Sequence, residues 1–168
     1  MVAVQLRDIV SEDDVEAVMG IRRGDGADRY IGPMIDHFQD AARDPDACPR
    51  MWSVHDAGTG RLVGFVMISD GVRQEVLDAR DDFVGPYFLW RLVIDEHDQR
   101  KGYGRATIDA LVDYVRTRPG ADVLYTSSVP GDGSPMPFYL HYGFELTDRI
   151  ADGEQVLRLD LPLAGGRR

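Results

Sequence analysis

Two glycines in one short turn are the residues of this chain best placed to bind a phosphate group. Gly102 and Gly104 lie in the run Gln99-Arg100-Lys101-Gly102-Tyr103-Gly104-Arg105, between an apolar stretch that ends at Ile94 and an amphipathic stretch that follows. Backbone N–H groups at a helix start carry partial positive charge, and glycines allow the backbone to approach a ligand closely. The spacing therefore predicts a strand, a pyrophosphate-binding turn and a helix.

Several classes of protein use such a turn, and the residues after the glycines separate them. A P-loop ends in Gly-Lys-Ser or Gly-Lys-Thr, whereas Arg105 and Ala106 follow Gly104. A dinucleotide fingerprint has a third glycine where Thr107 stands, and its acid ends the second strand, whereas Asp122 precedes the next apolar stretch. These departures disfavour both nucleotide-binding classes. An ordinary strand-to-helix turn without a ligand remains an alternative.

Hydrophobic periodicity predicts the elements that position this turn. Strands are expected over residues 2–7, 51–55, 61–69, 87–94, 123–128, 144–150 and 155–161, and helices over 12–19, 33–43, 105–116 and 134–141. Ser11 is a predicted helix N-cap, and residues 71–86 are expected to be irregular with one helical turn near 72–79. The strand–helix–strand unit over 87–128 implies one parallel strand pair. We therefore expect one α/β domain with a mixed sheet over residues 1–162 and a frayed tail at 163–168.

Composition narrows the partners that this chain is expected to have. The formal net charge is −10 over 168 residues, which disfavours nucleic acid and suits either a cationic small substrate or general solubility. Cys48 is the one cysteine, so no internal disulfide is possible. The sequence shows no signal peptide and no apolar run long enough to span a membrane. We expect a cytoplasmic protein without a membrane partner or a metal cofactor.

Two motifs, in order, resemble those of the GNAT superfamily of N-acetyltransferases. Leu92-Val93-Ile94 followed by Gln99-x-x-Gly102-x-Gly104 resembles its acetyl-CoA-binding motif, and Phe138-Tyr139-Leu140-His141-Tyr142-Gly143-Phe144 resembles its Phe-Tyr-x-x-x-Gly-Phe element. The order of the expected elements is also similar. The resemblance implies a mixed, mostly antiparallel sheet with a splayed central parallel strand pair, flanked by helices.

The resemblance also implies the residues that bind the cofactor, acetyl-CoA. Backbone groups of one strand would pair with the pantetheine arm, the turn would hold the pyrophosphate, and Lys101 and Arg105 would add charge. Ser134 would reach the cofactor or cap the short helix that follows it. The implied cofactor-binding residues are Leu92, Val93, Ile94, Gln99, Arg100, Lys101, Gly102, Tyr103, Gly104, Arg105 and Ser134.

Tyr139 is the implied general acid, because the tyrosine of this motif usually protonates the departing thiolate in the family. The alternative is a core aromatic side chain. Phe138 and Phe144 are expected to be core residues, which would leave Tyr139 facing the substrate cleft.

The general base stays open. Many family members place a carboxylate on the central strand, on the face toward the substrate. Here Phe88 and Trp90 are expected on that face and Arg91 on the other, so neither face offers an acid. A water chain or a carboxylate from another segment would then have to accept the proton. The carboxylates that could do so, none of which is favoured, are Glu75, Asp81, Asp82 and Asp36.

The acceptor is expected to be a primary amine. The run from Val129 to Pro135, together with Trp90-Arg91, is most similar to a bacterial branch of spermine/spermidine-type acetyltransferases. Trp90 or Tyr87 could bind an ammonium group through a cation–π contact. A polyamine-like small molecule is therefore favoured, by direct attack in a ternary complex. The alternatives are another small amine, a protein amine, or a non-catalytic acyl-CoA-binding sensor; the resemblance also makes a homodimer possible.

Overall fold

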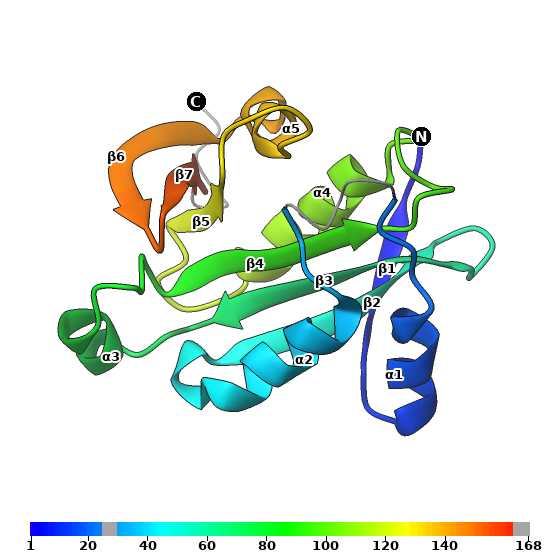
Figure 1. The fold of residues 1–168 in the computed structure, drawn as a ribbon, viewed down its shortest axis with the longest axis horizontal. Coiled ribbons are helices and arrows are strands. Elements are labelled where there is room, and N and C mark those ends of the chain that lie inside the picture. Colours follow the sequence, from blue (N-terminus) through cyan, green and yellow to red (C-terminus); the bar gives the residue numbers. More distant parts are fainter. Residues whose placement is uncertain (25–29, 163–168) are drawn as a thin grey trace.

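The computed structural model describes residues 1–24 and 30–162, whose strands form one seven-stranded sheet. The strand order is β1-β2-β3-β4-β5-β7-β6 (Figure 1). The strands are β1 Val4–Asp8, β2 Pro49–Asp56, β3 Leu62–Asp70, β4 Tyr87–Ile94, β5 Val123–Ser128, β6 Glu145–Ala151 and β7 Glu154–Asp160. All neighbouring strands are antiparallel except β4 and β5, which are parallel. The predicted α/β domain with a mostly antiparallel sheet is confirmed.

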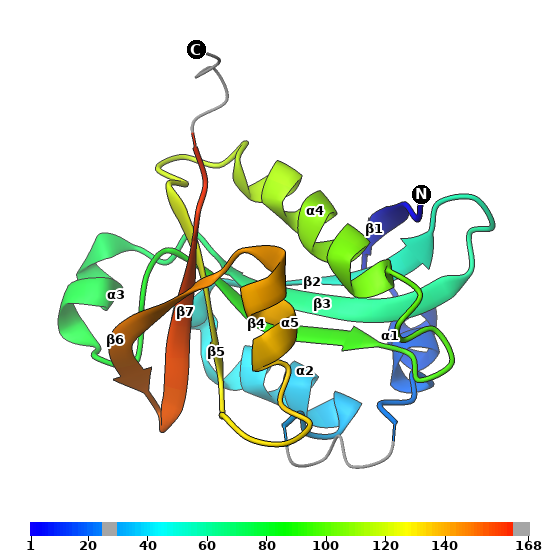
Figure 2. The same cartoon turned by 90° about the horizontal axis from the view of Figure 1, so that it is seen from above.

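Helices cover both faces of this sheet. They are α1 Glu12–Met19, α2 Met34–Arg43, the 3-10 helix η2 Pro45–Ala47, α3 Gln74–Ala79, α4 Tyr103–Val115 and α5 Met136–Tyr142. Figures 1 and 2 show α4 on one face and α1 and α2 on the other. None of the described helices is long and apolar enough to cross a membrane. The tail expected at 163–168 lies outside the described residues.

Local signals in the sequence account for several element boundaries. Ser11 is the N-cap of α1, as predicted: its hydroxyl accepts from the Asp14 amide at 3.2 Å, and the Asp14 carboxylate accepts from the Ser11 amide at 3.0 Å. The helix expected over 105–116 begins earlier, at Tyr103. Gly102 permits this start because its φ of 96° lies in the left-handed region that favours glycine.

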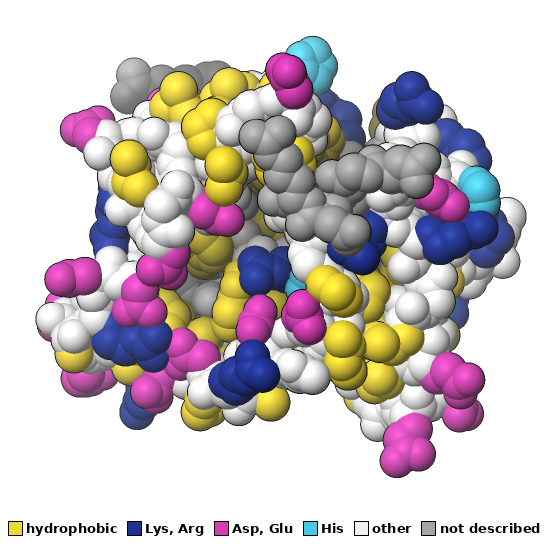
Figure 3. All heavy atoms as spheres, viewed as in Figure 1, with side chains coloured by type: hydrophobic (Ala, Val, Ile, Leu, Met, Phe, Trp, Pro, Cys, Tyr) yellow, Lys and Arg dark blue, Asp and Glu magenta, His cyan; other side chains and the backbone are white. Residues whose placement is uncertain are grey.

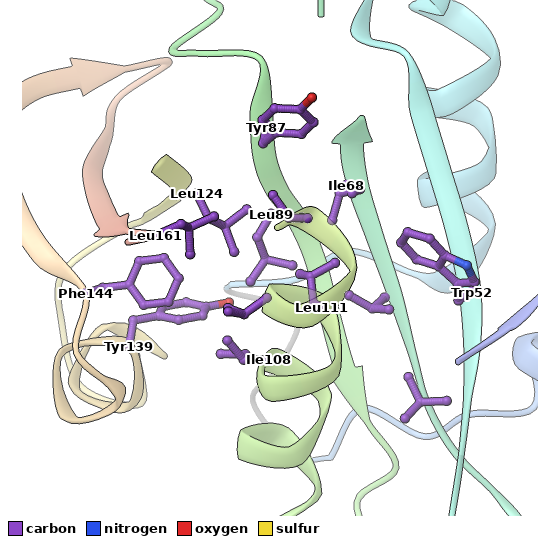
Figure 4. Packing of buried hydrophobic residues seen from close by; sticks show 14 of the residues in the cluster. Trp52, Ile68, Tyr87, Leu89, Ile108, Leu111, Leu124, Tyr139, Phe144 and Leu161 are labelled. Carbon is purple, nitrogen blue, oxygen red and sulfur yellow. The ribbon is translucent and has the colours of Figure 1, made fainter. Parts of the chain in front are cut away.

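Each face of the sheet buries its own apolar cluster. The α4 face holds the larger cluster, shown in part in Figure 4, which includes Leu89, Ile108, Leu111 and Leu124. The α1 and α2 face buries residues such as Val18, Met34, Phe65, Met67 and Val93. Full burial of such side chains stabilises a fold by about 1.5–3 kcal/mol each. β4, in the middle of this sheet, is therefore held in place by buried side chains on both faces.

A β-bulge interrupts β4 at Trp90. Met67 of β3 pairs with Arg91 and Ile68 pairs with Leu89, which leaves Trp90 as an extra residue. Strand side chains normally alternate between faces, but across this bulge Trp90 and Arg91 both lie on the α2 face. The expectation that Arg91 lies opposite Trp90 is therefore wrong, because the alternation stops at the bulge.

The sheet opens between β4 and β5 just beyond this bulge. The parallel pairing covers only Phe88 with Tyr125 and Leu89 with Thr126. The Thr126 hydroxyl donates to the Leu89 carbonyl at 3.0 Å and marks the end of the paired part. In the described part of the chain, the edge of β4 over residues 90–94 that faces β5 has no strand partner, and Figure 2 shows the two strands diverging.

Candidate active site

The glycine turn presents backbone donors at the start of α4. The Ala106 amide donates to the Gly102 carbonyl at 3.0 Å, so the amides of Tyr103, Gly104 and Arg105 precede the first intrahelical hydrogen bond. No acidic residue lies in the first turn of the helix. This arrangement favours an anion at the helix start.

A buried carboxylate fixes the shape of the turn. Asp98 is 1% exposed and accepts hydrogen bonds from both terminal nitrogens of Arg61, at 2.6 and 2.8 Å, and from the Lys101 ammonium at 3.1 Å. The hydrogen bonds from Arg61 are the main reason why the pKa of Asp98 falls to about 2. The turn is thus held by an ionised side chain over the whole neutral range. Lys101 contributes to this bracing as well as to the positive charge of the turn.

Gln99 connects the turn to two other segments. Its side-chain nitrogen donates to the carbonyls of Arg23 and Ile94, both at 3.1 Å. These contacts tie the turn to the end of β4 and to the segment that precedes α2. The side chain of Gln99 therefore holds the turn in position. The backbone amides at the start of α4, not this side chain, are the donors available to an anion.

The other expected cofactor residues of the turn have side chains directed elsewhere. The Tyr103 hydroxyl donates to the Asp56 carboxylate at 2.8 Å, and the Arg105 guanidinium lies 5.2 Å from the Tyr142 ring centroid. Arg100 is exposed and has a positive φ of 60°. These residues would therefore contact a ligand chiefly through their backbone amides and not through their side chains.

A cleft lies where the sheet opens, and we call it the β4–β5 cleft. Its volume is about 640 Å³. Of the expected cofactor residues, Leu92 and Gln99 line it, whereas Val93 and Ile94 pack against the two buried clusters. Its lining consists of Arg23, Gly24, Tyr30, Ile31, Trp90, Arg91, Leu92, Gln99, Thr126, Ser127, Ser128, Val129, Asp132, Gly133, Pro135, Tyr139 and Glu154.

Tyr139 reaches this cleft from α5. Its ring packs edge-on against Phe144, with the centroids 5.5 Å apart, and only 7% of the residue is exposed. In Figure 4 its hydroxyl is directed toward β4. Burial raises the pKa of Tyr139 to about 12, although the Thr126 hydroxyl and the Arg91 charge act in the opposite direction. The phenol is therefore protonated at neutral pH and able to donate a proton.

The neighbouring phenylalanine is not where it was expected. Phe138 is 36% exposed, so the expectation that it is a core residue is wrong, whereas Phe144 is 2% exposed and lies in the core. The reason is helix geometry: at 3.6 residues per turn, successive side chains point about 100° apart, so Phe138 turns outward when Tyr139 points inward. Phe138 instead lies over the glycine turn: a Cβ atom added at Gly104 would come within 3.2 Å of its ring.

Arg91 is held in the cleft by α2. Its Nε donates to Nδ1 of His37 at 3.2 Å, and its guanidinium lies 3.4 Å from the Asp40 carboxylate. His37 is 1% exposed, and its ring stacks on Phe65. Burial, followed by the Arg91 charge, lowers the pKa of His37 to about 4. A neutral imidazole is what accepts the hydrogen bond from Arg91 at neutral pH.

A second hollow adjoins the β4–β5 cleft, and we call it the acidic pocket. It has a volume of about 280 Å³ and lies on the face shown in Figure 3, where acidic side chains surround a hollow left of centre. Its lining is Asp44, Ala47, Ser69, Asp82, Phe83, Val84, Phe88, Trp90, Arg91, Ser127, Ala151, Asp152 and Glu154. The aromatic and acidic groups suit an amine with an apolar body, and Arg91 is the cation in the lining.

Four residues line both hollows and mark their junction: Trp90, Arg91, Ser127 and Glu154. The Ser127 hydroxyl donates to the Glu154 carboxylate at 2.5 Å. Glu154 begins β7, which pairs with β5, so this carboxylate lies beside the open end of β5. No motif surrounds Glu154 in the sequence, and its position at the junction depends on the pairing of β7 between β5 and β6.

Two residues expected at the site do not line either hollow. Tyr87 is 3% exposed on the α4 face, and its hydroxyl donates to the Pro119 carbonyl at 2.6 Å. It is therefore not part of the site proposed below, unlike Trp90. Ser134 donates to the Val129 carbonyl at 2.6 Å and accepts from the Met136 amide at 3.1 Å, just before α5, whose N-cap is Pro135.

Of the four acids expected as possible bases, only Asp82 lines a hollow. Asp82 lines the acidic pocket but is paired with Arg80, whose nitrogen lies 2.5 Å from its carboxylate. Glu75, Asp81 and Asp36 line neither hollow.

The mixed sheet thus opens beside the start of α4, and Tyr139 lies in the opening. The model of the acetyltransferase (GNAT) family matches residues 15–144, and the chain belongs to this family. Transfer of an acetyl group from acetyl-CoA is the general activity of this family.

Solved structures with the same fold come from proteins with different acceptors. The ribosomal-protein-S18-alanine N-acetyltransferase from Escherichia coli is 16% identical, with 98% of each chain covered and a TM-score of 0.62. The AtaTR structure bound with AcCoA is 15% identical, with 95% and 94% covered and a TM-score of 0.64. The spermidine/spermine N-acetyltransferase SpeG from Vibrio cholerae is 16% identical, with 95% and 93% covered and a TM-score of 0.56. No curated protein matches the chain significantly by sequence.

Proposed function

We propose that this protein transfers acetyl from acetyl-CoA to a primary amine by direct attack in a ternary complex, with a polyamine-like small molecule as the favoured acceptor. The observation that carries the proposal is the junction of the two hollows. A thioester lying in the β4–β5 cleft would meet an amine from the acidic pocket beside Trp90 and Glu154. Tyr139 would protonate the departing sulfur.

The cofactor site is proposed along β4 and the glycine turn. The amides of Tyr103, Gly104 and Arg105 would bind the pyrophosphate. The free edge of β4 over residues 90–94 would pair with the amides of the pantetheine arm, as an added strand would. A backbone amide on this edge could then stabilise the negative charge that develops on the thioester carbonyl oxygen.

The acidic pocket supports a cationic acceptor. Carboxylates of Asp82, Asp152 and Glu154 line it together with aromatic rings, and the chain carries a net charge of −10. A protein amine remains an alternative acceptor, because structures with this fold include both a ribosomal-protein acetyltransferase and a spermidine/spermine acetyltransferase. A non-catalytic acyl-CoA sensor would need no base, and β4 carries no carboxylate on the substrate face. Glu154 at the junction offers a carboxylate from another strand and so favours the enzyme.

The proposal is tested by measuring thiol release from acetyl-CoA with a panel that contains spermidine, spermine, simple monoamines and a peptide with a free N-terminus. We expect turnover with the polyamines at lower concentrations than with the peptide. Turnover with the peptide alone would replace the polyamine acceptor by a protein amine. Tight CoA binding without turnover with any amine would favour the sensor.

We expect Gly104→Val to weaken acetyl-CoA binding by about tenfold or more. A Cβ atom at this position already lies 3.2 Å from the Phe138 ring, so a branched side chain would enter the space above the turn. Isothermal titration calorimetry with CoA measures the effect. Gly104→Ala is the matched control, because it adds the Cβ atom without the two further methyl groups of valine. Equal affinities for the valine variant and the control would contradict the proposed pyrophosphate site.

A further inference from the structure

The side chains of Tyr139 and Glu154 approach the opening of the sheet from opposite faces. Thr126 and Ser127 are adjacent on β5, so their side chains point to opposite faces. Thr126 lies beside the Tyr139 hydroxyl on the α4 face, and Ser127 donates to Glu154 on the α2 face. A thioester between β4 and β5 would therefore have a proton donor on one side and a carboxylate on the other.

The carboxylate is held in an orientation that leaves it free to accept a proton. The Ser127 hydroxyl bonds Oε2 of Glu154 at 2.5 Å, and among the described residues Oε1 has no side-chain partner within hydrogen-bond distance. Glu154 is partly buried and lines both the acidic pocket and the β4–β5 cleft. The acceptor amine has to pass this carboxylate on its way from the pocket to the thioester.

We propose that Glu154 accepts the proton from the acceptor ammonium at the junction of the two hollows, with Ser127 as the residue that positions it. This assignment rests on the acetyltransferase activity proposed above. It supplies the base that β4 lacks, because the bulge at Trp90 places an indole and a guanidinium where a strand carboxylate would otherwise lie.

The proton balance then closes. Glu154 takes one proton from R–NH₃⁺, and the nitrogen lone pair attacks the carbonyl carbon of the thioester. The C–N bond forms, the C–S bond breaks, and its electron pair leaves with sulfur, which takes the phenolic proton of Tyr139. The second proton lost by the nitrogen returns through water to the Tyr139 oxygen, and Glu154 releases its own proton to solvent. The net products are the acetylated amine, CoA with a free thiol, and one proton.

Charged and phenolic groups from several elements surround Glu154. Arg91 of β4 is a guanidinium, which stays cationic, and burial raises the pKa of Tyr139 on α5 to about 12. The remaining charged groups that line the acidic pocket are carboxylates, Asp44, Asp82 and Asp152, with Arg80 paired to the first two. The neutral fraction of the acceptor amine itself rises steeply between pH 7 and 10, as expected for an alkylammonium group.

The decisive experiment compares kcat/KM of the full chain and of Glu154→Gln from pH 6 to 10, with whichever amine the wild-type protein acetylates best. We expect a loss of about 10²-fold at pH 7 that shrinks to a few-fold as the free amine becomes neutral in solution. The KM for acetyl-CoA should stay within about twofold. Hydroxylamine, which is mostly neutral at pH 7, should show the smaller loss already at that pH.

Glu145→Gln is the matched control, because Glu145 is an exposed glutamate at the start of β6, in the same hairpin. A loss in Glu154→Gln that is the same at every pH would assign the residue a structural role and overturn the inference. Activity of Glu154→Gln equal to that of the wild-type protein would also overturn the inference. In both cases the wild-type turnover would still stand, whereas absence of wild-type turnover with any acceptor would contradict the acetyltransferase proposal itself.

Discussion

Replacing Tyr139 by phenylalanine should lower kcat by about 10²-fold or more while leaving the affinity for acetyl-CoA almost unchanged. The substitution removes only the hydroxyl, and the ring keeps its place against Phe144. Without the phenolic proton, sulfur would leave as a thiolate and take its proton from water. Steady-state kinetics with saturating acetyl-CoA, together with calorimetry of CoA binding, separates the two effects.

Tyr142→Phe is the control for this substitution. Tyr142 lies on the same helix, and its hydroxyl donates to Asp109 at 2.8 Å, away from the β4–β5 cleft. Its removal should leave kcat within about twofold. If Tyr139→Phe also retained wild-type kcat, the proton would have to come from another donor, and the role proposed for Tyr139 would be withdrawn.

The second large effect is a loss of stability in mild acid that depends on His37. Its pKa is lowered from 6.5 to about 4, chiefly by burial, so the folded state favours the neutral ring. The stabilisation is complete above pH 6.5 and is lost as the pH falls through about 4. This difference corresponds to about 3 kcal/mol. Urea unfolding at a series of pH values from 7 to 4 measures the free energy of unfolding.

His37→Asn should remove this part of the acid sensitivity, since an amide oxygen can accept the hydrogen bond from Arg91 without titrating. The matched control is His97→Asn, because His97 is an exposed histidine in the turn after β4. That variant should follow the wild-type curve. A His37→Asn curve parallel to the wild type between pH 6.5 and 4 would show that other groups cause the acid loss.

The sequence predicts those parts of the site whose geometry depends on neighbouring residues. The glycine turn, the start of a helix beside it, and an α5 that carries Tyr139 all follow from local spacing and end signals. The parallel pair of β4 and β5 follows from the strand–helix–strand order. Each of these features is encoded in a continuous stretch of chain, and the longest of these stretches is the strand–helix–strand unit over residues 87–128.

The remaining parts depend on pairing between distant strands. The bulge at Trp90 exists only relative to β3, and no pattern within β4 predicts that Arg91 joins Trp90 on one face. Glu154 reaches the junction because β7 pairs with β5 across a long sequence separation. The exposure of Phe138 likewise depends on where α5 rests, since its apolar side chain alone predicts burial.

The insertion of β7 between β5 and β6 has a consequence for the synthesis of this protein. Residues 92–105, which form the proposed cofactor site, leave the ribosome well before Glu154, and β5 keeps an unpaired edge until β7 arrives. A nascent chain that ends near residue 150 would carry the glycine turn and Tyr139 but no carboxylate at the junction. The proposed transfer chemistry thus becomes available only when the last strand of the sheet has been made and docked.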